Sequence, residues 1–153
     1  MNQHTAIANN ASTWSNSSIV QDYKEEIAYD ANGNILTYFR NGTTAGGKPL
    51  AMDNLSYRYL PGSNKLDHVS DAVTATNYTE DIDNQDTLNY TYDAIGNLTK
   101  DVKEGIDNIS WTVYGKIQQI TKTNGTVIKY DYDATGNRVV KNVIPPSGGW
   151  GGC

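Results

Sequence analysis

The stretch that decides the fold reads Leu88-Asn-Tyr-Thr-Tyr-Asp-Ala-Ile-Gly-Asn-Leu-Thr99. Apolar and polar residues alternate up to Tyr92, which is the period of a half-buried β-strand. Asp93 then opens a tight turn, because an Asp at the first turn position accepts backbone N–H groups further along the turn. Gly96 supplies the positive φ of a type I turn followed by a bulge, and the return strand begins at Leu98. The stretch therefore predicts a strand, a turn and a strand.

This unit recurs along the chain. Residues 29–35 (YDANGNI) and 132–138 (YDATGNR) match it almost letter for letter, and residues 55–66 and 111–117 are weaker copies. One weaker copy shifts its glycine, and the other lacks the Asp and the Asn. The copies start at residues 29, 59, 92, 111 and 132, so the underlying period is about 20 residues, with longer inserts after the first two. A period of this size indicates an array of one supersecondary unit.

The three good copies share one turn chemistry. An Asp recurs at the same turn position in each, which favours capping of the backbone over a catalytic role. The residues predicted to build these turns are Tyr29, Asp30, Gly33, Asn34, Tyr92, Asp93, Gly96, Asn97, Tyr132, Asp133, Gly136 and Asn137.

The YD-x-x-G-N units and their spacing resemble the YD repeats of the RHS family, found in bacterial RHS proteins, in the BC part of insecticidal toxin complexes and in animal teneurins. The resemblance covers roughly residues 19–143. It implies an all-β fold of sequential antiparallel hairpins in a twisted, curved sheet, a piece of a spiral β-shell. It also implies a secreted or cell-surface protein. The family's self-cleaving core and C-terminal toxin domain are not found in this chain.

Alternation and turn residues predict about ten strands and no helix. The Asn124-Gly125 pair predicts a two-residue type I′ hairpin loop, with Thr121 opposite Ile128. Residues 41–54 and 70–86 are expected to be loops, because they are polar and lack alternation. The predicted strands are residues 19–29, 35–40, 55–59, 65–69, 87–92, 98–102, 109–113, 117–123, 126–132 and 138–143.

The two ends of the chain differ from the repeats. Residues 1–18 are rich in Asn, Ser and Thr and predict an irregular or extended lead-in without a signal peptide. Residues 144–153 are rich in Pro and Gly and end at the single cysteine, Cys153, which favours an engineered tail over a natural linker. An open sheet of such strands leaves unpaired backbone groups on its outer strands. The predicted partners are therefore other repeats, or copies of the chain itself, at the sheet edges.

Composition and motifs argue against several classes of function. The net charge is −5 and no basic cluster stands out, so no nucleic-acid surface is expected, and no apolar run is long enough to span a membrane. His4 and His68 are the only histidines, and no nucleophile lies in a recognisable motif, so no enzyme and no cofactor are predicted. Residues 80–86 (EDIDNQD) loosely match a calcium loop but lack its Gly and distal Glu, which favours a solvated loop and no metal site.

The leading functional hypothesis is a non-catalytic structural repeat module. The resemblance implies a β-sheet wall that encloses a toxin polypeptide or presents a surface for cell contact. One alternative is a self-assembling fibre or adhesive module that pairs through strand edges. Another is a carbohydrate-binding module, in which Trp14, Trp111 and several Tyr rings would line one open groove.

Overall fold

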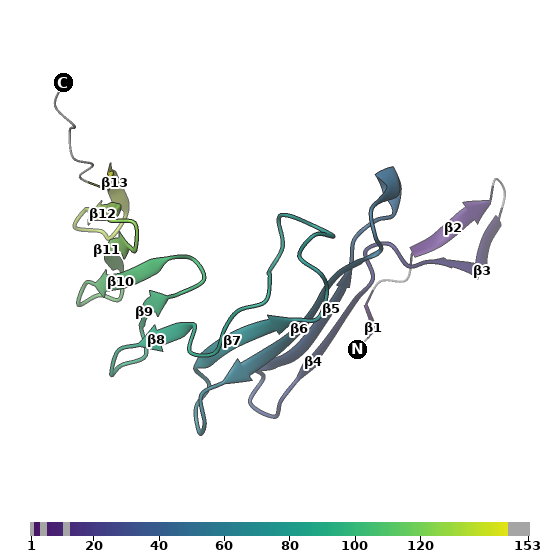
Figure 1. Cartoon of the computed structure of the whole chain (residues 1–153), viewed down its shortest axis with the longest axis horizontal. Helices are drawn as coiled ribbons and strands as arrows, with labels where there is room; N and C mark the ends of the chain where they lie inside the picture. The colour runs from purple at the N-terminus through teal and green to yellow at the C-terminus, as the bar shows by residue number, and fades with distance from the viewer. Residues whose placement is uncertain (1, 4–5, 11–12, 147–153) are drawn as a thin grey trace. The chain divides into compact units, whose positions relative to one another are not determined.

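The computed structural model describes residues 2–3, 6–10 and 13–146, with side chains from residue 20 onward, and it is all-β (Figure 1). Every strand pair in this part of the chain is antiparallel. The described residues contain no α-helix, only a 3₁₀ turn at Ala45–Gly47, and no helix long and apolar enough to cross a membrane. The all-β prediction is confirmed.

The chain divides into two compact units, Met1–Thr87 and Leu88–Cys153. This division falls inside the range 19–143 that the repeats suggested as one domain. Unit 1 contains a five-stranded sheet in the order β1-β4-β5-β6-β7 and a separate two-stranded sheet, β2-β3. Its strands are β1 (Asn2–Gln3), β2 (Ala6–Asn10), β3 (Thr13–Val20), β4 (Glu25–Tyr29), β5 (Ile35–Asn41), β6 (Ala51–Tyr59) and β7 (Leu66–Asp71).

Unit 2 contains a six-stranded sheet in which neighbours in sequence are neighbours in space, in the order β13-β12-β11-β10-β9-β8 (Figure 1). Consecutive strands pair because each is joined to the next by a short turn. The strands are β8 (Tyr90–Tyr92), β9 (Leu98–Asp101), β10 (Ile106–Trp111), β11 (Ile117–Lys122), β12 (Val127–Tyr132) and β13 (Arg138–Ile144).

The structure corrects several sequence predictions. The sequence suggested one continuous sheet, whereas sheet pairing stops after β7 and begins again at β8. Residues 1–18 were expected to be irregular or extended, and they contain β1, β2 and most of β3, since backbone pairing needs no apolar alternation. The predicted strand 19–29 is broken, since Tyr23 has a φ of 59° and its N–H donates to the Gly42 carbonyl. β6 begins inside the predicted loop 41–54, because Ala51 already pairs with Asn41.

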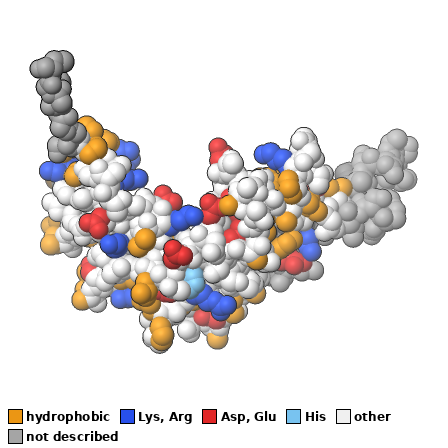
Figure 2. Space-filling model, in the orientation of Figure 1, with side chains coloured by type: hydrophobic (Ala, Val, Ile, Leu, Met, Phe, Trp, Pro, Cys, Tyr) orange, Lys and Arg blue, Asp and Glu red, His pale blue; other side chains and the backbone are white. Residues whose placement is uncertain are grey.

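The apolar core is thin in both units. Leu55, Val69 and Ile109 are the buried hydrophobic residues among those described. Polar side chains share the interior: Asn89 donates to Asp101 at 3.1 Å and accepts the Lys103 N–H at 2.7 Å. On the face drawn in Figure 2, hydrophobic side chains reach the surface at many places, and Lys and Arg are dispersed. The fold therefore depends on strand pairing and turn hydrogen bonds more than on a deep core.

Candidate functional site

Five hairpin turns have the same backbone geometry. In each, the N–H of the first turn residue donates to the carbonyl four residues on, and the fourth residue, a glycine with positive φ, donates back to the first carbonyl. This is the pattern of a type I turn followed by a one-residue bulge. The first residues of these repeat turns are Asp30, Asp93, Thr112, Lys122 and Asp133.

Three of the repeat turns are capped by their first residue. Asp30, Asp93 and Asp133 each accept the N–H four residues on, at 2.8 Å, and the N–H two residues on, at 2.9 to 3.1 Å. Their second carboxylate oxygen accepts the side-chain amide of Asn34, Asn97 or Asn137. In the Tyr-Asp-x-x-Gly-Asn signature, the Asp carboxylate thus accepts hydrogen bonds from the backbone N–H groups and the Asn side chain of its own turn.

The capping hydrogen bonds favour the ionised carboxylates. The Asn34 side chain is the largest cause of the lowered pKa of Asp30, and the Thr135 hydroxyl is the largest cause that lowers the pKa of Asp133 to about 2. Burial acts to raise the pKa of Asp93, but hydrogen bonds led by Asn97 outweigh it and lower the value. A carboxyl group held ionised in this way is suited to structure rather than to proton transfer near neutral pH.

The turn at Asn124-Gly125 corrects a sequence prediction. A type I′ loop needs positive φ at both residues, whereas Gly125 alone of the pair has it. The turn runs from Lys122 to Thr126 with the hydrogen bonds of the other repeat turns, and Thr121 therefore lies opposite Val127 instead of Ile128. The predicted turn type and register are wrong by one residue, because the bulge adds one position to the loop.

A second bulge also recurs in five hairpins. The pairing of each hairpin shifts by one residue directly beside the aromatic residue that precedes the turn, so that one return-strand residue is skipped. The weaker copies at Tyr59 and Trp111 follow the same rule as the three good ones. The skipped residues are Leu36, Asp67, Thr99, Gln118 and Val139.

The aromatic residue of one hairpin is bonded to the hairpin before it. In unit 1, the Tyr59 hydroxyl donates to the Ile35 carbonyl at 2.8 Å. In unit 2, Trp111 Nε1 donates to the Leu98 carbonyl at 2.7 Å, and the Tyr132 hydroxyl donates to the Ile117 carbonyl at 2.8 Å. We call these three hydrogen bonds the aromatic stitches. Each acceptor is the first residue of the preceding return strand, six positions after that hairpin's own aromatic residue.

Neighbouring turns also make contact through the position that Asn occupies in the good copies. Asn64 Oδ1 accepts the Asn34 side-chain amide at 2.9 Å. Lys116 Nζ donates to the Gly136 carbonyl and lies 5.3 Å from the centre of the Tyr132 ring. Sequence reasoning missed these contacts and the acceptors of the stitches. The available signal was a fixed offset from each aromatic residue.

An open groove among the described residues of unit 2 bears on the carbohydrate hypothesis. It has a volume of about 790 Å³ and is lined by Tyr114, Tyr130 and Tyr132, with Lys116 and Asp131. Trp111 is not among the lining residues, and its ring N–H donates to the Leu98 carbonyl. The side chain of Trp14 lies outside the described residues. Several Tyr rings therefore line this groove, as the carbohydrate hypothesis expects, whereas Trp111 does not.

The remaining sequence candidates lie apart from the repeat turns. His68 Nδ1 is 2.8 Å from Asp67 Oδ2, while His4 and Cys153 lie outside the described residues. From the acidic loop 80–86, Asp81 lies against Asp53 and Asp71 of unit 1. Sequence analysis missed Asp53 and Asp71. A signal was present for Asp53: it lies two positions before Leu55 on one strand, so the two side chains are on the same face, where an acidic residue is unexpected.

No family model matches the chain, and no curated protein matches it.

Proposed function

We propose that the chain is a non-catalytic structural repeat module, whose hairpins join into a β-sheet wall through the aromatic stitches. The observation that carries this proposal is the recurrence of one hairpin geometry in copies whose sequences differ. Tyr59 and Trp111 lie in the two weakest copies, yet both make the stitch to the preceding hairpin. The same contact to the preceding hairpin is therefore kept in copies of different sequence. An array stabilised by interfaces between neighbouring repeats requires such a contact.

The kind of wall follows from the resemblance to YD repeats and remains part of the proposal. Such a wall would lie outside the cell or at its surface, and it would enclose a toxin polypeptide or present a surface for cell contact. Its physical task would be to keep a hydrogen-bonded barrier closed. The three capped turns and the stitches suit this task, because their hydrogen bonds hold the hairpins in shape where few apolar side chains are buried.

The stitch is tested with Tyr132→Phe, which removes one hydroxyl and keeps the ring. We expect amide hydrogen exchange to become faster in β11 as well as in β12, because the lost hydrogen bond joins Tyr132 to the Ile117 carbonyl. Tyr114→Phe is the matched control, since its ring is in the same unit and 86% exposed. Faster exchange confined to β12, or an equal effect in both variants, would mean that the stitch does not couple the two hairpins and would remove the proposal.

A second candidate function, self-assembly through a strand edge, is favoured by β13. This strand forms one edge of the unit 2 sheet, and all seven of its residues are exposed. Val139, Val140 and Val143 are among its exposed hydrophobic side chains. An exposed edge strand of this kind is a template for pairing with another chain.

Light scattering on a size-exclusion column, with reductant present, separates the two functions. Edge pairing predicts species above the monomer mass of 16.8 kDa, and Val140→Lys is expected to return the chain to the monomer. Val113→Lys is the control, because Val113 is exposed but lies in a turn. A wild-type chain that stays monomeric at high concentration would exclude self-assembly and leave the wall with edges closed within one chain.

A further inference from the structure

Three carboxylates from different segments of unit 1 meet beside the sheet. Asp53 lies on β6, Asp71 is the last residue of β7, and Asp81 lies in residues 72–87, which we call the return loop. One carboxylate oxygen from each can be chosen so that all three lie within 4.8 Å of one another. The segments are far apart in sequence, so the cluster is a product of the fold.

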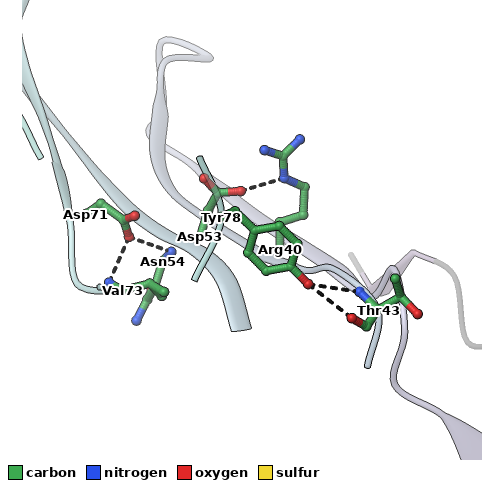
Figure 3. Close-up of polar contacts among 7 residues, drawn as sticks. All are labelled: Arg40, Thr43, Asp53, Asn54, Asp71, Val73 and Tyr78. Atoms are coloured by element: carbon green, nitrogen blue, oxygen red, sulfur yellow. Dashed lines mark hydrogen bonds and ion pairs between the residues drawn. The ribbon is translucent and has the colours of Figure 1, made fainter. Parts of the chain in front are cut away.

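The buried carboxylate of Asp53 is a second, independent indication that a ligand binds at this cluster. Its side chain is 0% exposed, and Oδ2 is paired with Arg40 Nε at 2.6 Å. Its other oxygen, Oδ1, is buried and has no hydrogen-bond partner among the residues that the structure describes. Figure 3 shows this oxygen on the side away from Arg40, facing Asp71. A buried carboxylate oxygen without a partner is costly, so it indicates a group that binds there.

The orientation of Asp71 is also set by the fold. Its Oδ1 accepts the N–H of Asn54 at 2.9 Å and the N–H of Val73 at 3.0 Å (Figure 3). These bonds hold the carboxylate at the point where β7 ends and the return loop begins. Two of the three acidic groups are therefore positioned by backbone and cross-strand contacts before any ligand arrives, which reduces the cost of binding.

The charges of the cluster do not cancel. Arg40 is the cation paired with Asp53, so three ionised carboxylates would leave two negative charges in excess. The cluster is thus repulsive unless Asp81 takes up a proton or a cation lies among the carboxylates. A proton on Asp81 and a cation among the carboxylates predict different responses to added Ca²⁺.

We propose that Asp53, Asp71 and Asp81 bind a divalent cation, Ca²⁺, which fastens the return loop to β6 and β7. Ca²⁺ prefers carboxylate and carbonyl oxygens at about 2.4 Å, so ligands on opposite sides of the ion are about 4.8 Å apart. The cluster meets this limit, and water and backbone carbonyls complete such sites. The smaller Mg²⁺ requires a tighter octahedron and is expected to bind more weakly here.

The test is calorimetric titration of the full chain, treated first with a chelator, using CaCl₂ and, separately, MgCl₂. We expect one Ca²⁺ per chain and a higher melting temperature in Ca²⁺ than in EDTA. Asp81→Asn should weaken Ca²⁺ binding by roughly tenfold or more, because it removes a ligand. Asp86→Asn is the matched control: it makes the same charge change in the same loop, at an exposed residue outside the cluster.

The outcomes separate the cation from the proton. Suppose that Asp81→Asn raises the melting temperature in EDTA but Ca²⁺ does not bind the wild type at millimolar concentration. Protonation of Asp81 then relieves the repulsion among the carboxylates, and the proposal fails. It also fails if Asp86→Asn weakens binding as much as Asp81→Asn. Hydrogen exchange on the wild type needs no variant: Ca²⁺ should slow exchange in the return loop more than in unit 2, and equal effects would overturn the proposal.

Discussion

Replacing Gly42 by alanine tests how the return loop is held on the unit 1 sheet. A Cβ placed at Gly42 would lie 2.0 Å from the Tyr78 hydroxyl oxygen and 2.4 Å from its Cζ, so the tyrosine would have to leave. Gly42 is not among the residues with positive φ, and its backbone therefore accepts alanine without strain. The whole effect should come from the displaced ring.

The contacts that Tyr78 would lose set the size of the effect. Its hydroxyl accepts the Thr43 N–H at 3.1 Å and donates to the Pro49 carbonyl at 2.9 Å, and Lys48 Nζ lies 5.1 Å from the ring centre (Figure 3 shows Tyr78 and Thr43). A hydrogen bond contributes about 0.5–1.5 kcal/mol and an exposed cation–π contact about 0.5–1 kcal/mol. We expect Gly42→Ala to lower the free energy of unfolding by about 2–3 kcal/mol.

The assay is urea unfolding followed by circular dichroism, arranged as a double-mutant cycle with Tyr78→Ala. In the Tyr78→Ala background the clash is absent, so adding Gly42→Ala should change the unfolding free energy by less than about 0.5 kcal/mol. If Gly42→Ala costs as much in that background as in the wild type, the clash is not the cause. A Gly42→Ala variant with wild-type stability would refute the placement of Tyr78.

Two further predictions concern the repeat turns. Gly96→Val should lower the free energy of unfolding by about 1–3 kcal/mol, because Gly96 has a φ of 100° that a β-branched residue resists; a thermal melt matching that of wild type would contradict it. The folded pKa of Asp133 is lowered to about 2, so its stabilising effect is present above its unfolded pKa of about 3.9 and is lost as the pH falls toward 2. The difference in melting temperature between wild type and Asp133→Asn should therefore shrink from pH 5 to pH 2, and a difference independent of pH would count against the capping role.

The turns were the part of the fold most open to prediction from sequence. A repeat turn needs a residue that tolerates positive φ at its fourth position, and the three capped turns add an Asp acceptor at the first, so both signals lie within five consecutive residues. The type I′ error at Asn124-Gly125 has a local cause as well. An Asn-Gly pair fits both a two-residue loop and the last positions of a longer one, and the neighbouring strands decide between them.

The candidate sites were less predictable because their partners are distant in sequence. Asp81 belongs to a loop whose spacing loosely matches a calcium site, but the carboxylates that cluster with it, Asp53 and Asp71, lie on β6 and β7. The aromatic residue of each stitch was recognisable from the repeat. Its acceptor was missed because any residue type supplies a backbone carbonyl, so only the fixed offset from the preceding aromatic residue marks it in the sequence.

The sequence by itself determined the strand-and-turn alternation, the all-β class and the capping chemistry of the three Asp turns, since each depends on residues within one hairpin. Tertiary structure alone decided the division into two sheets, the stitches and the position of the return loop. Tyr78 and Thr43 are 35 residues apart, and Trp111 and Leu98 are 13 apart. The physical reason is that turn geometry follows from local backbone preferences, whereas pairing and loop docking follow from which distant polar groups find partners.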